Sequence, residues 1–339
     1  MWIGIGPYRA DVLAALAKYV VAIAVVDRVA IFLRSRDEPD QMVAVAGVPE
    51  DVVGSYMPAD AGIPGEVMRH GRPVLVNDYQ QLERPLSYAG TEELRGGAGV
   101  PIEIAGETLG ALSAYSVAPE RTFDARDVAL LCEAAAVGGL ALEHAGMREQ
   151  VEQQLAATVR AMATAVDMRD QYTAEHSRQV VWLANQVGER LGLDEQCARE
   201  LEYAALLHDV GKIGIPDAVL HKPAQLDSAE WGWIERHPVL GESLLATIPG
   251  LARVARIVRS EHERFDGRGY PDGLAGDAIP LESGIILACD AYHAMTSDRP
   301  YRRAMTHAEA VEEIRRGAGA QFAPDAAEAL LAVLGADQR

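Results

Sequence analysis

The residues best suited to catalytic chemistry lie in the second half of the chain. His208 and Asp209 are adjacent and follow the apolar run 201–207. A neighbouring imidazole and carboxylate can reach one metal ion together, and the carboxylate can bridge to a second ion. Lys212 follows four residues after His208, so in a continuing helix it shares that face, where its ammonium could hold a phosphate oxygen. The alternative is a buried histidine that bonds to its neighbour at the end of a helix.

Other imidazoles and carboxylates are spread around this pair, at His176, His237, His262 and Asp290. Such ligands suit Fe, Mn, Co, Ni or Zn, and the lack of thiolates among them argues against a structural zinc site. Asp290 ends the otherwise apolar run 285–289, and buried acids are rare unless they are paired or bind a metal. Its alternative role is a helix-end carboxylate paired with an arginine.

The charge balance restricts the classes of partner. The 339 residues include 31 Lys and Arg against 50 Asp and Glu, a formal net charge of −19. This charge argues against general binding of duplex nucleic acid, which needs a basic face to neutralise phosphates. A small anionic substrate held by a local basic cluster stays compatible. Arginines that could form such a cluster are Arg264, Arg268, Arg299, Arg302 and Arg303.

Cysteine usage and apolar runs predict the compartment. Three cysteines, Cys132, Cys197 and Cys289, are too few and too far apart for a disulfide framework, so a reducing compartment is expected. The most apolar stretch, 19–33, is interrupted by charges and falls short of the ~20 apolar residues of a membrane span. No signal peptide is visible. We therefore expect a cytoplasmic protein with no membrane association.

The first half of the chain is predicted to be mixed α and β structure. Short strands are expected at 29–33, 42–46 and 72–78, where apolar or β-branched runs end in turns. The runs 99–104 and 109–115 flank a Gly-containing turn, which predicts a hairpin. A small antiparallel sheet with flanking helices accounts for this pattern.

A long helix is predicted next. Asp124 and Asp127 are typical of a helix start, and helix formers continue without proline from Ala125 to about Asp170. Inside it lies a narrow apolar seam of Val151, Leu155, Met162 and Val166. Such a seam is typical of a two-stranded coiled coil and predicts a homodimer. The alternative is a long helix packed on its own domain.

Beyond residue 170 the chain is predicted to be helical throughout. Thr173, Asp194, Asp227 and Thr306 indicate helix starts. Gly192 indicates a helix C-terminus. The long segment 266–282 is predicted to be a loop, and loops of that length are usually functional.

Residues from about 150 to 335 resemble the HD-GYP family, a branch of the HD phosphohydrolases. The resemblance rests on three motifs in their order and spacing: His208-Asp209-Val210-Gly211-Lys212, then His262-Glu263-Arg264-Phe265-Asp266-Gly267-Arg268-Gly269-Tyr270-Pro271, then Asp290 through Thr296-Ser297-Asp298-Arg299-Pro300-Tyr301-Arg302. It implies an all-helical fold with a centre of two or three metal ions that hydrolyses cyclic di-GMP.

Roles follow from the resemblance residue by residue. The implied metal ligands are His176, His208, Asp209, His237, His262 and Asp290. Lys212, Arg299 and Arg302 would hold the phosphates, and Tyr270 would line the site or contact a partner. The implied cofactor is two divalent metal ions, Fe or Mn. Bridged by Asp209, they would activate a shared water for in-line attack, with Lys212 adding positive charge.

Three positions depart from the family pattern. Glu261 stands where many members have the first of two paired histidines; a glutamate can ligate these metals, so Glu261 is a further candidate ligand, or else one ligand is lost. Tyr172 stands where three-metal members have a glutamate, so two metals are expected. His293 replaces an aspartate three residues after Asp290, which could alter the contacts of a ligand or the choice of substrate.

Residues 1–145 resemble a GAF domain, a sensory module that binds small molecules or only dimerises. The matching segments are 58–67, 72–78, 99–102, 109–113 and Phe123-Asp124. The predicted organisation is α+β: a GAF-like sensor at 1–145, a connecting and dimerisation helix at 146–170, and an all-α HD-GYP domain at 171–339. A small-molecule ligand of the GAF domain and a ligand-free dimer scaffold stay open as alternatives.

The combined prediction is a signalling enzyme in which a GAF sensor controls a phosphodiesterase that opens cyclic di-GMP to pGpG and further to GMP. One alternative is an HD phosphohydrolase for another cyclic dinucleotide or nucleotide. The other is a catalytically inactive protein that binds cyclic di-GMP or a partner. In that case the loop 267–280 would be the docking surface. Independently of these alternatives, the Gly-Tyr-Pro loop is a candidate docking surface for a cyclic di-GMP synthase.

Overall fold

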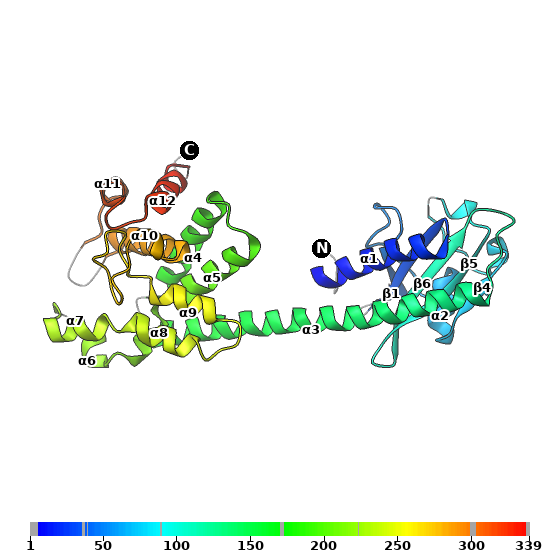
Figure 1. The fold of residues 1–339 in the computed structure, drawn as a ribbon, viewed down its shortest axis with the longest axis horizontal. Coiled ribbons are helices and arrows are strands. Elements are labelled where there is room, and N and C mark those ends of the chain that lie inside the picture. The colour runs from blue at the N-terminus through cyan, green and yellow to red at the C-terminus, as the bar shows by residue number, and fades with distance from the viewer. Residues whose placement is uncertain are drawn as a thin grey trace. The chain divides into compact units, whose positions relative to one another are not determined.

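The computed structural model describes residues 6–35, 38, 40–88, 90–169, 173–222, 224–298 and 303–336. The chain forms two compact units, Met1–Gln153 and Gln154–Arg339. The first is a sheet with helices and the second is helical, which confirms the predicted α+β class (Figure 1). One continuous helix, α3 (Ala125–Arg169), contributes residues to both units.

The first unit is built on a six-stranded sheet in the order β3-β2-β1-β6-β5-β4, in which all neighbours are antiparallel. Its strands are β1 (Arg28–Arg34), β2 (Gln41–Ala46), β3 (Tyr56–Pro58), β4 (Val74–Val76), β5 (Gly96–Ile104) and β6 (Glu107–Ser116). The short edge strand β3 was not predicted. The predicted hairpin is confirmed as β5 and β6, joined through Ala105 (φ 50°) and Gly106 (φ 82°). Two positive φ angles in a two-residue loop match the twist of the flanking strands.

Helices cover both faces of this sheet. Side chains alternate along a strand, so Ile31 faces the cluster that contains α1 (Pro7–Ala24) and the first part of α3, while Phe32 faces α2 (Gly62–His70). The two faces of the sheet therefore contribute to two separate hydrophobic cores. This arrangement explains why the first half of the sequence reads as short strands bounded by turns.

The second unit is a bundle of helices. After α3 come α4 (Thr173–Arg190), α5 (Glu195–Leu207), the 3-10 helix η3 (His208–Gly214), α6 (Asp217–Leu220), α7 (Ser228–Ile234), α8 (His237–Leu245), α9 (Ala252–Arg259), η4 (Gly276–Ala278), α10 (Leu281–Thr296), α11 (His307–Gly317) and α12 (Pro324–Ala336). Asp194, Asp227 and Thr306 accept backbone hydrogen bonds at the starts of α5, α7 and α11. These three predicted helix starts are confirmed.

The predicted coiled-coil seam is wrong in register. Val166 is buried in the core of the helical unit, and Leu155 and Met162 pack against that core. Only Val151 of the four is exposed, at 63%. The spacing is the same for a helix that packs on its own bundle and for one that pairs with a second chain. The alternative of packing on its own domain therefore holds for three of the four positions.

The length and apolar composition of α3 also bear on whether it could cross a membrane. Within the described residues, its segment Ala125–Val166 is the one helix whose length and composition would allow it to cross a membrane, and 39% of its most apolar window is buried. Core helices of folded domains pass the same test, so this is weak support for a span.

Candidate metal centre

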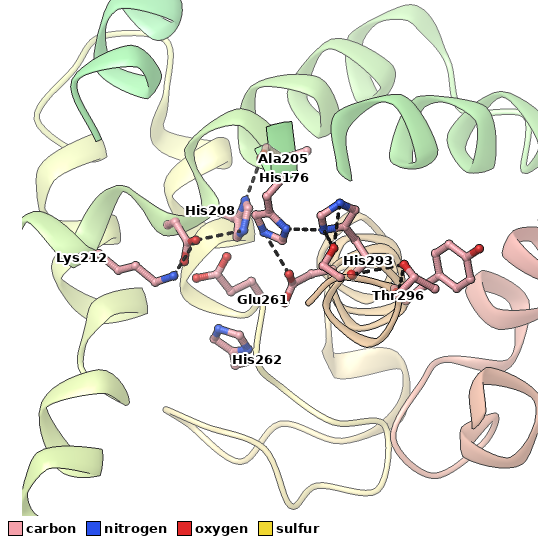
Figure 2. A network of polar contacts seen from close by, with 12 residues as sticks. His176, Ala205, His208, Lys212, Glu261, His262, His293 and Thr296 are labelled. Carbon is pink, nitrogen blue, oxygen red and sulfur yellow. Dashed lines mark hydrogen bonds and ion pairs between the residues drawn. The ribbon is translucent and has the colours of Figure 1, made fainter. Parts of the chain in front are cut away.

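Five segments of the helical unit contribute the predicted site residues. Figure 2 shows four of these residues, His176, His208, Glu261 and His262, close together. His176 comes from α4, His208 and Asp209 from η3, His237 begins α8, Glu261 and His262 follow α9, and Asp290 comes from α10. The close approach of η3 to α8 requires Gly211, because a Cβ there would lie 1.9 Å from the carbonyl oxygen of His237. Because Gly211 has no side chain, η3 can pack closely enough on α8 to bring His208 and Asp209 next to His237.

One group of ligand atoms surrounds His176. The donor atoms of His176, His208 and Asp209 lie within 4.8 Å of one another, and all three residues are buried. Asp290 joins them, with Oδ1 3.2 Å from Nε2 of His176. Nε2 of His208 lies 3.5 Å from Oδ2 of Asp209. This is a compact set of imidazole and carboxylate groups.

A second group lies beside the first. It consists of His237, Glu261 and His262, whose ligand atoms are again within 4.8 Å. Nε2 of His237 is 3.0 Å from Oε1 of Glu261 and 3.2 Å from Nε2 of His262. Oδ1 of Asp209 lies 3.8 Å from Nε2 of His237. Asp209 therefore offers one oxygen to each group.

The tautomers of two histidines leave lone pairs facing these clusters. Nδ1 of His208 lies 2.8 Å from the carbonyl oxygen of Ala205, and Nδ1 of His237 lies 2.6 Å from that of Ile234. A carbonyl only accepts, so each Nδ1 carries the hydrogen. In a neutral ring the Nε2 atom is then an acceptor. These two Nε2 atoms thus point electron pairs at carboxylate oxygens, an arrangement that only a proton or a cation stabilises.

Glu261 adds an unsatisfied carboxylate to this centre. The residue is 1% exposed, and neither carboxylate oxygen has a hydrogen-bond partner among the described residues. Burial raises the pKa of Glu261 well above its usual value. A buried acid without donors is costly, and a divalent cation between it and His237 would remove that cost. The residues of the centre therefore fit bound metal ions.

The protonation states of the other groups also suit metal ligands. Burial would raise the pKa of Asp209, but Lys212, His208 and His237 outweigh it and hold the pKa well below its usual range. Burial lowers the pKa of His262 to about 3. At neutral pH Asp209 is therefore ionised and His262 is neutral. These are the forms that bind a metal.

His293 contacts His176, one of the histidines of the first group. Its Nδ1 lies 2.7 Å from Nδ1 of His176, and its ring is buried and tilted against that ring with centroids 4.7 Å apart. Ser297 lies 3.3 Å from Nε2 of His293. The sequence departure at 293 thus falls on the residue that orients His176.

The Gly-Tyr-Pro loop packs directly on the site. The ring of Tyr270 stacks on that of His262, with centroids 4.9 Å apart and planes at 26°. Glu263 is 1% exposed and accepts hydrogen bonds from the amides of Asp272 (2.7 Å), Gly273 (3.1 Å) and Leu274 (3.0 Å). Sequence reasoning missed Glu263, although its place directly after His262 in the motif was the available signal.

Of the basic residues predicted to lie at the site, Lys212 contacts a candidate ligand and Arg264 does not. Nζ of Lys212 donates to Oδ2 of Asp209 at 2.7 Å, in a 3-10 turn rather than the predicted continuing helix. Arg264 bonds to Asp266, two residues away, rather than reaching the ligand groups. Arg299 and Arg302, like Tyr172, lie outside the described residues.

The fold and the site together define an HD domain: a helical domain centred on an adjacent His-Asp pair with further histidines around it. Residues 160–326 match the family model described as HD domain, and residues 9–143 match that described as GAF domain. The chain therefore carries a GAF domain followed by an HD domain with the motifs of the HD-GYP branch.

Curated relatives match about half of the chain. The chain is 41% identical over 184 residues to the cyclic di-GMP phosphodiesterase response regulator RpfG of Xanthomonas campestris, covering 54% of this chain and 49% of that protein. It is 38% identical over 167 residues to a cyclic di-GMP phosphodiesterase of Thermotoga maritima, covering 49% and 45%. It is 39% identical over 147 residues to the 3'3'-cGAMP-specific phosphodiesterase 3 of Vibrio cholerae, covering 43% and 32%. The chain spans about half of the length of the first two relatives and about a third of the length of the third.

Proposed function

We propose that this protein is a metal-dependent phosphodiesterase that hydrolyses cyclic di-GMP to pGpG, and further to GMP, under the control of its GAF domain. The observation that carries the proposal is the position of Asp209, whose two oxygens face two separate groups of ligand atoms. The names of two relatives, 41% and 38% identical, support the same substrate.

Two divalent metal ions, Fe or Mn, are the cofactors of this proposal. His176, His208, Asp209 and Asp290 would hold one, and Asp209, His237, Glu261 and His262 the other. Imidazole with carboxylate is the ligand set that these ions accept. When bound, such ions supply an ionised water at neutral pH and neutralise charge on phosphate oxygens.

The chain's own cations and ring complete the site. Lys212 donates to the bridging carboxylate at 2.7 Å, so its ammonium is held where a phosphate oxygen would approach the metals. Tyr270, stacked on His262, would form a wall of the substrate site. Arg299 and Arg302 are proposed as further phosphate contacts on the basis of their motif alone.

A hybrid cyclic dinucleotide is the second candidate substrate. Relatives from Vibrio cholerae are named 3'3'-cGAMP-specific phosphodiesterases and reach 39% identity. Glu261 and His293 lie in and beside the ligand groups, so these departures can shift how the scissile phosphate is held. A catalytically inactive protein that only binds a cyclic dinucleotide is the remaining alternative.

A homodimer is part of the proposal, along a face of α3 that shares only Val151 with the predicted seam. Val137, Leu140, Met147 and Val151 are 67%, 71%, 53% and 63% exposed. With the exposed His144 between them they follow alternating steps of three and four residues. That spacing is the a/d pattern of a two-stranded coiled coil. A second copy of this chain is the partner that matches it.

The GAF domain and the loop have proposed partners as well. A cavity of about 620 Å³ beside β3 is lined by Tyr56, Asp60, Arg84 and Tyr88 among others, and it is the proposed place of a small-molecule ligand. The Gly-Tyr-Pro loop is a proposed docking surface for a cyclic di-GMP synthase. A cytoplasmic location agrees with such partners.

The deciding experiment uses full-length protein purified without chelator. Bound metals are counted per chain, and cyclic di-GMP and 3'3'-cGAMP are incubated in parallel with Mn or Fe(II). We expect about two metals and pGpG formation, with both lost in Asp209→Ala and unchanged in Glu189→Ala, a surface control. Turnover of the hybrid dinucleotide alone would favour the second candidate. Neither metal nor turnover after reconstitution would leave the binding protein.

A further inference from the structure

The last residue of α3 holds the segment that carries the His-Asp pair. The guanidinium of Arg169 donates to the carbonyl oxygens of Lys212 (2.8 Å), Ile213 (2.5 Å) and Ile215 (2.6 Å). It also pairs with the carboxylate of Asp217 at 2.7 Å. One side chain thus donates to three carbonyl groups within four residues, at the end of η3 and just beyond it.

These carbonyls belong to the backbone from which the catalytic groups project. Nζ of Lys212 donates to Asp209, and the carbonyl of Lys212 accepts from Arg169 and from the amide of Ile215 (3.0 Å). A 3-10 helix has weaker hydrogen-bond geometry than an α-helix. The end of such a helix therefore needs an outside donor to keep its last carbonyls in place.

The chemistry of the contact favours arginine over lysine. A guanidinium is a planar fork with five donors, whereas an ammonium is a compact point charge on a flexible stem. Only the fork can reach several carbonyls and a carboxylate from one position. The Arg169 side chain is 29% exposed and its partner Asp217 is 73% exposed. The contacts with the carbonyls of Lys212 and Ile215 are half-buried, so they are better protected from water than the exposed ion pair.

We propose that Arg169 is a positioning residue, which fixes η3 from the end of α3 and thereby sets the placement of Lys212 against Asp209. The proposal rests on the phosphodiesterase activity proposed above only for its kinetic consequence. Because α3 runs without a break from the GAF unit, Arg169 also makes the end of that helix part of the support of the active site.

The test compares Arg169→Gln and Arg169→Lys with the wild type in the full chain. Arg160→Gln is the matched control, since Arg160 is an exposed arginine on the same helix. Hydrogen–deuterium exchange of residues 208–217 is measured in metal-free protein. We expect exchange there to rise at least tenfold in Arg169→Gln, less in Arg169→Lys, and not in Arg160→Gln.

The kinetic readout separates positioning from binding. We expect kcat for the dinucleotide to fall 10- to 100-fold in Arg169→Gln, with KM and metal content changed less than threefold. Exchange and kcat both within twofold of the wild type would overturn the proposal. If the wild type hydrolyses no dinucleotide, the exchange result still decides the role of Arg169 on its own. Should Arg169→Gln fail to fold, Arg169→Lys and the exposed Asp217→Asn carry the same comparison.

Discussion

At the scale of single residues, the centre is defined by acceptors that face one another. The carbonyl oxygens of Ala205 and Ile234 fix the hydrogen on Nδ1 of His208 and His237. Each Nε2 lone pair then faces a carboxylate, and Glu261 has no donor among the described residues. Such a cluster is unfavourable when empty and favourable with cations. This balance motivates two predictions.

Glu261 should be required for one of two metals. Replacement by alanine removes the carboxylate that lies 3.0 Å from Nε2 of His237. We expect elemental analysis to give about one metal per chain in Glu261→Ala and about two in Glu261→His, because an imidazole restores a ligand. Asp209→Ala should lose occupancy of both positions. Two metals retained in Glu261→Ala would contradict the ligand role.

His293 should tune the affinity of the other metal. It bonds to Nδ1 of His176 at 2.7 Å, and partners that orient a metal-bound histidine typically contribute about 10- to 100-fold in affinity. We expect His293→Ala to weaken metal binding by about tenfold in a chelator competition. His293→Asp should retain it, since a carboxylate can accept from His176. Equal affinity in all three proteins would show that His293 only packs.

At the scale of elements, α3 has two faces with different functions. Leu155, Met162 and Val166 face the helical core, whereas Val137, Leu140, Met147 and Val151 are exposed. Four large apolar side chains in a row are an unusual surface for a folded domain. The homodimer proposed above would bury that face against a second copy.

A charge on the exposed face should therefore separate the dimer. We expect light scattering after size exclusion to give a dimer for the wild type and a monomer for the double variant Leu140→Glu, Met147→Glu. Circular dichroism should be unchanged, because both side chains lie outside the core. Trp182→Glu, which alters an equally exposed apolar residue on α4, should leave the dimer intact. A wild type that is monomeric at all concentrations would refute this interface.

At the scale of the whole molecule, one helix contributes residues to both the GAF unit and the HD unit. Arg169 at its end contacts the backbone of Lys212, and its first residues belong to the GAF unit. The rotational phase of the helix is then a physical link between the two units. An α-helix has ~3.6 residues per turn, so an insertion of seven residues nearly preserves the phase, whereas an insertion of five turns it by roughly 140°.

Insertions after Gln153 should test this link. We expect a seven-residue helical insertion to keep phosphodiesterase activity within about threefold of the wild type, since the phase differs by only ~20°. A five-residue insertion should change activity by tenfold or more in either direction, and Arg169→Gln should reduce the difference between the two insertions. Equal activity of both insertions would mean that the phase of α3 carries no signal.

The sequence alone determined the parts of this protein that depend on local spacing. Helix starts at Asp194, Asp227 and Thr306 and the β5–β6 hairpin are set by neighbours within a few residues. The HD-GYP motifs and their order are visible directly in the sequence. These features follow from capping, turn chemistry and motif order. They were sufficient to predict a sheet domain, a long helix and a helical domain with a candidate metal centre.

Only the tertiary structure decided which side chains meet. Burial of Glu261 without a donor, the contact of His293 with His176, the three amides on Glu263 and the reach of Arg169 to η3 all join segments that are not predictable from spacing. The predicted coiled-coil seam of α3 was wrong for the same reason. A spacing of three or four residues shows which side chains share a helix face, but not which segment packs on that face. Packing between distant segments makes that choice.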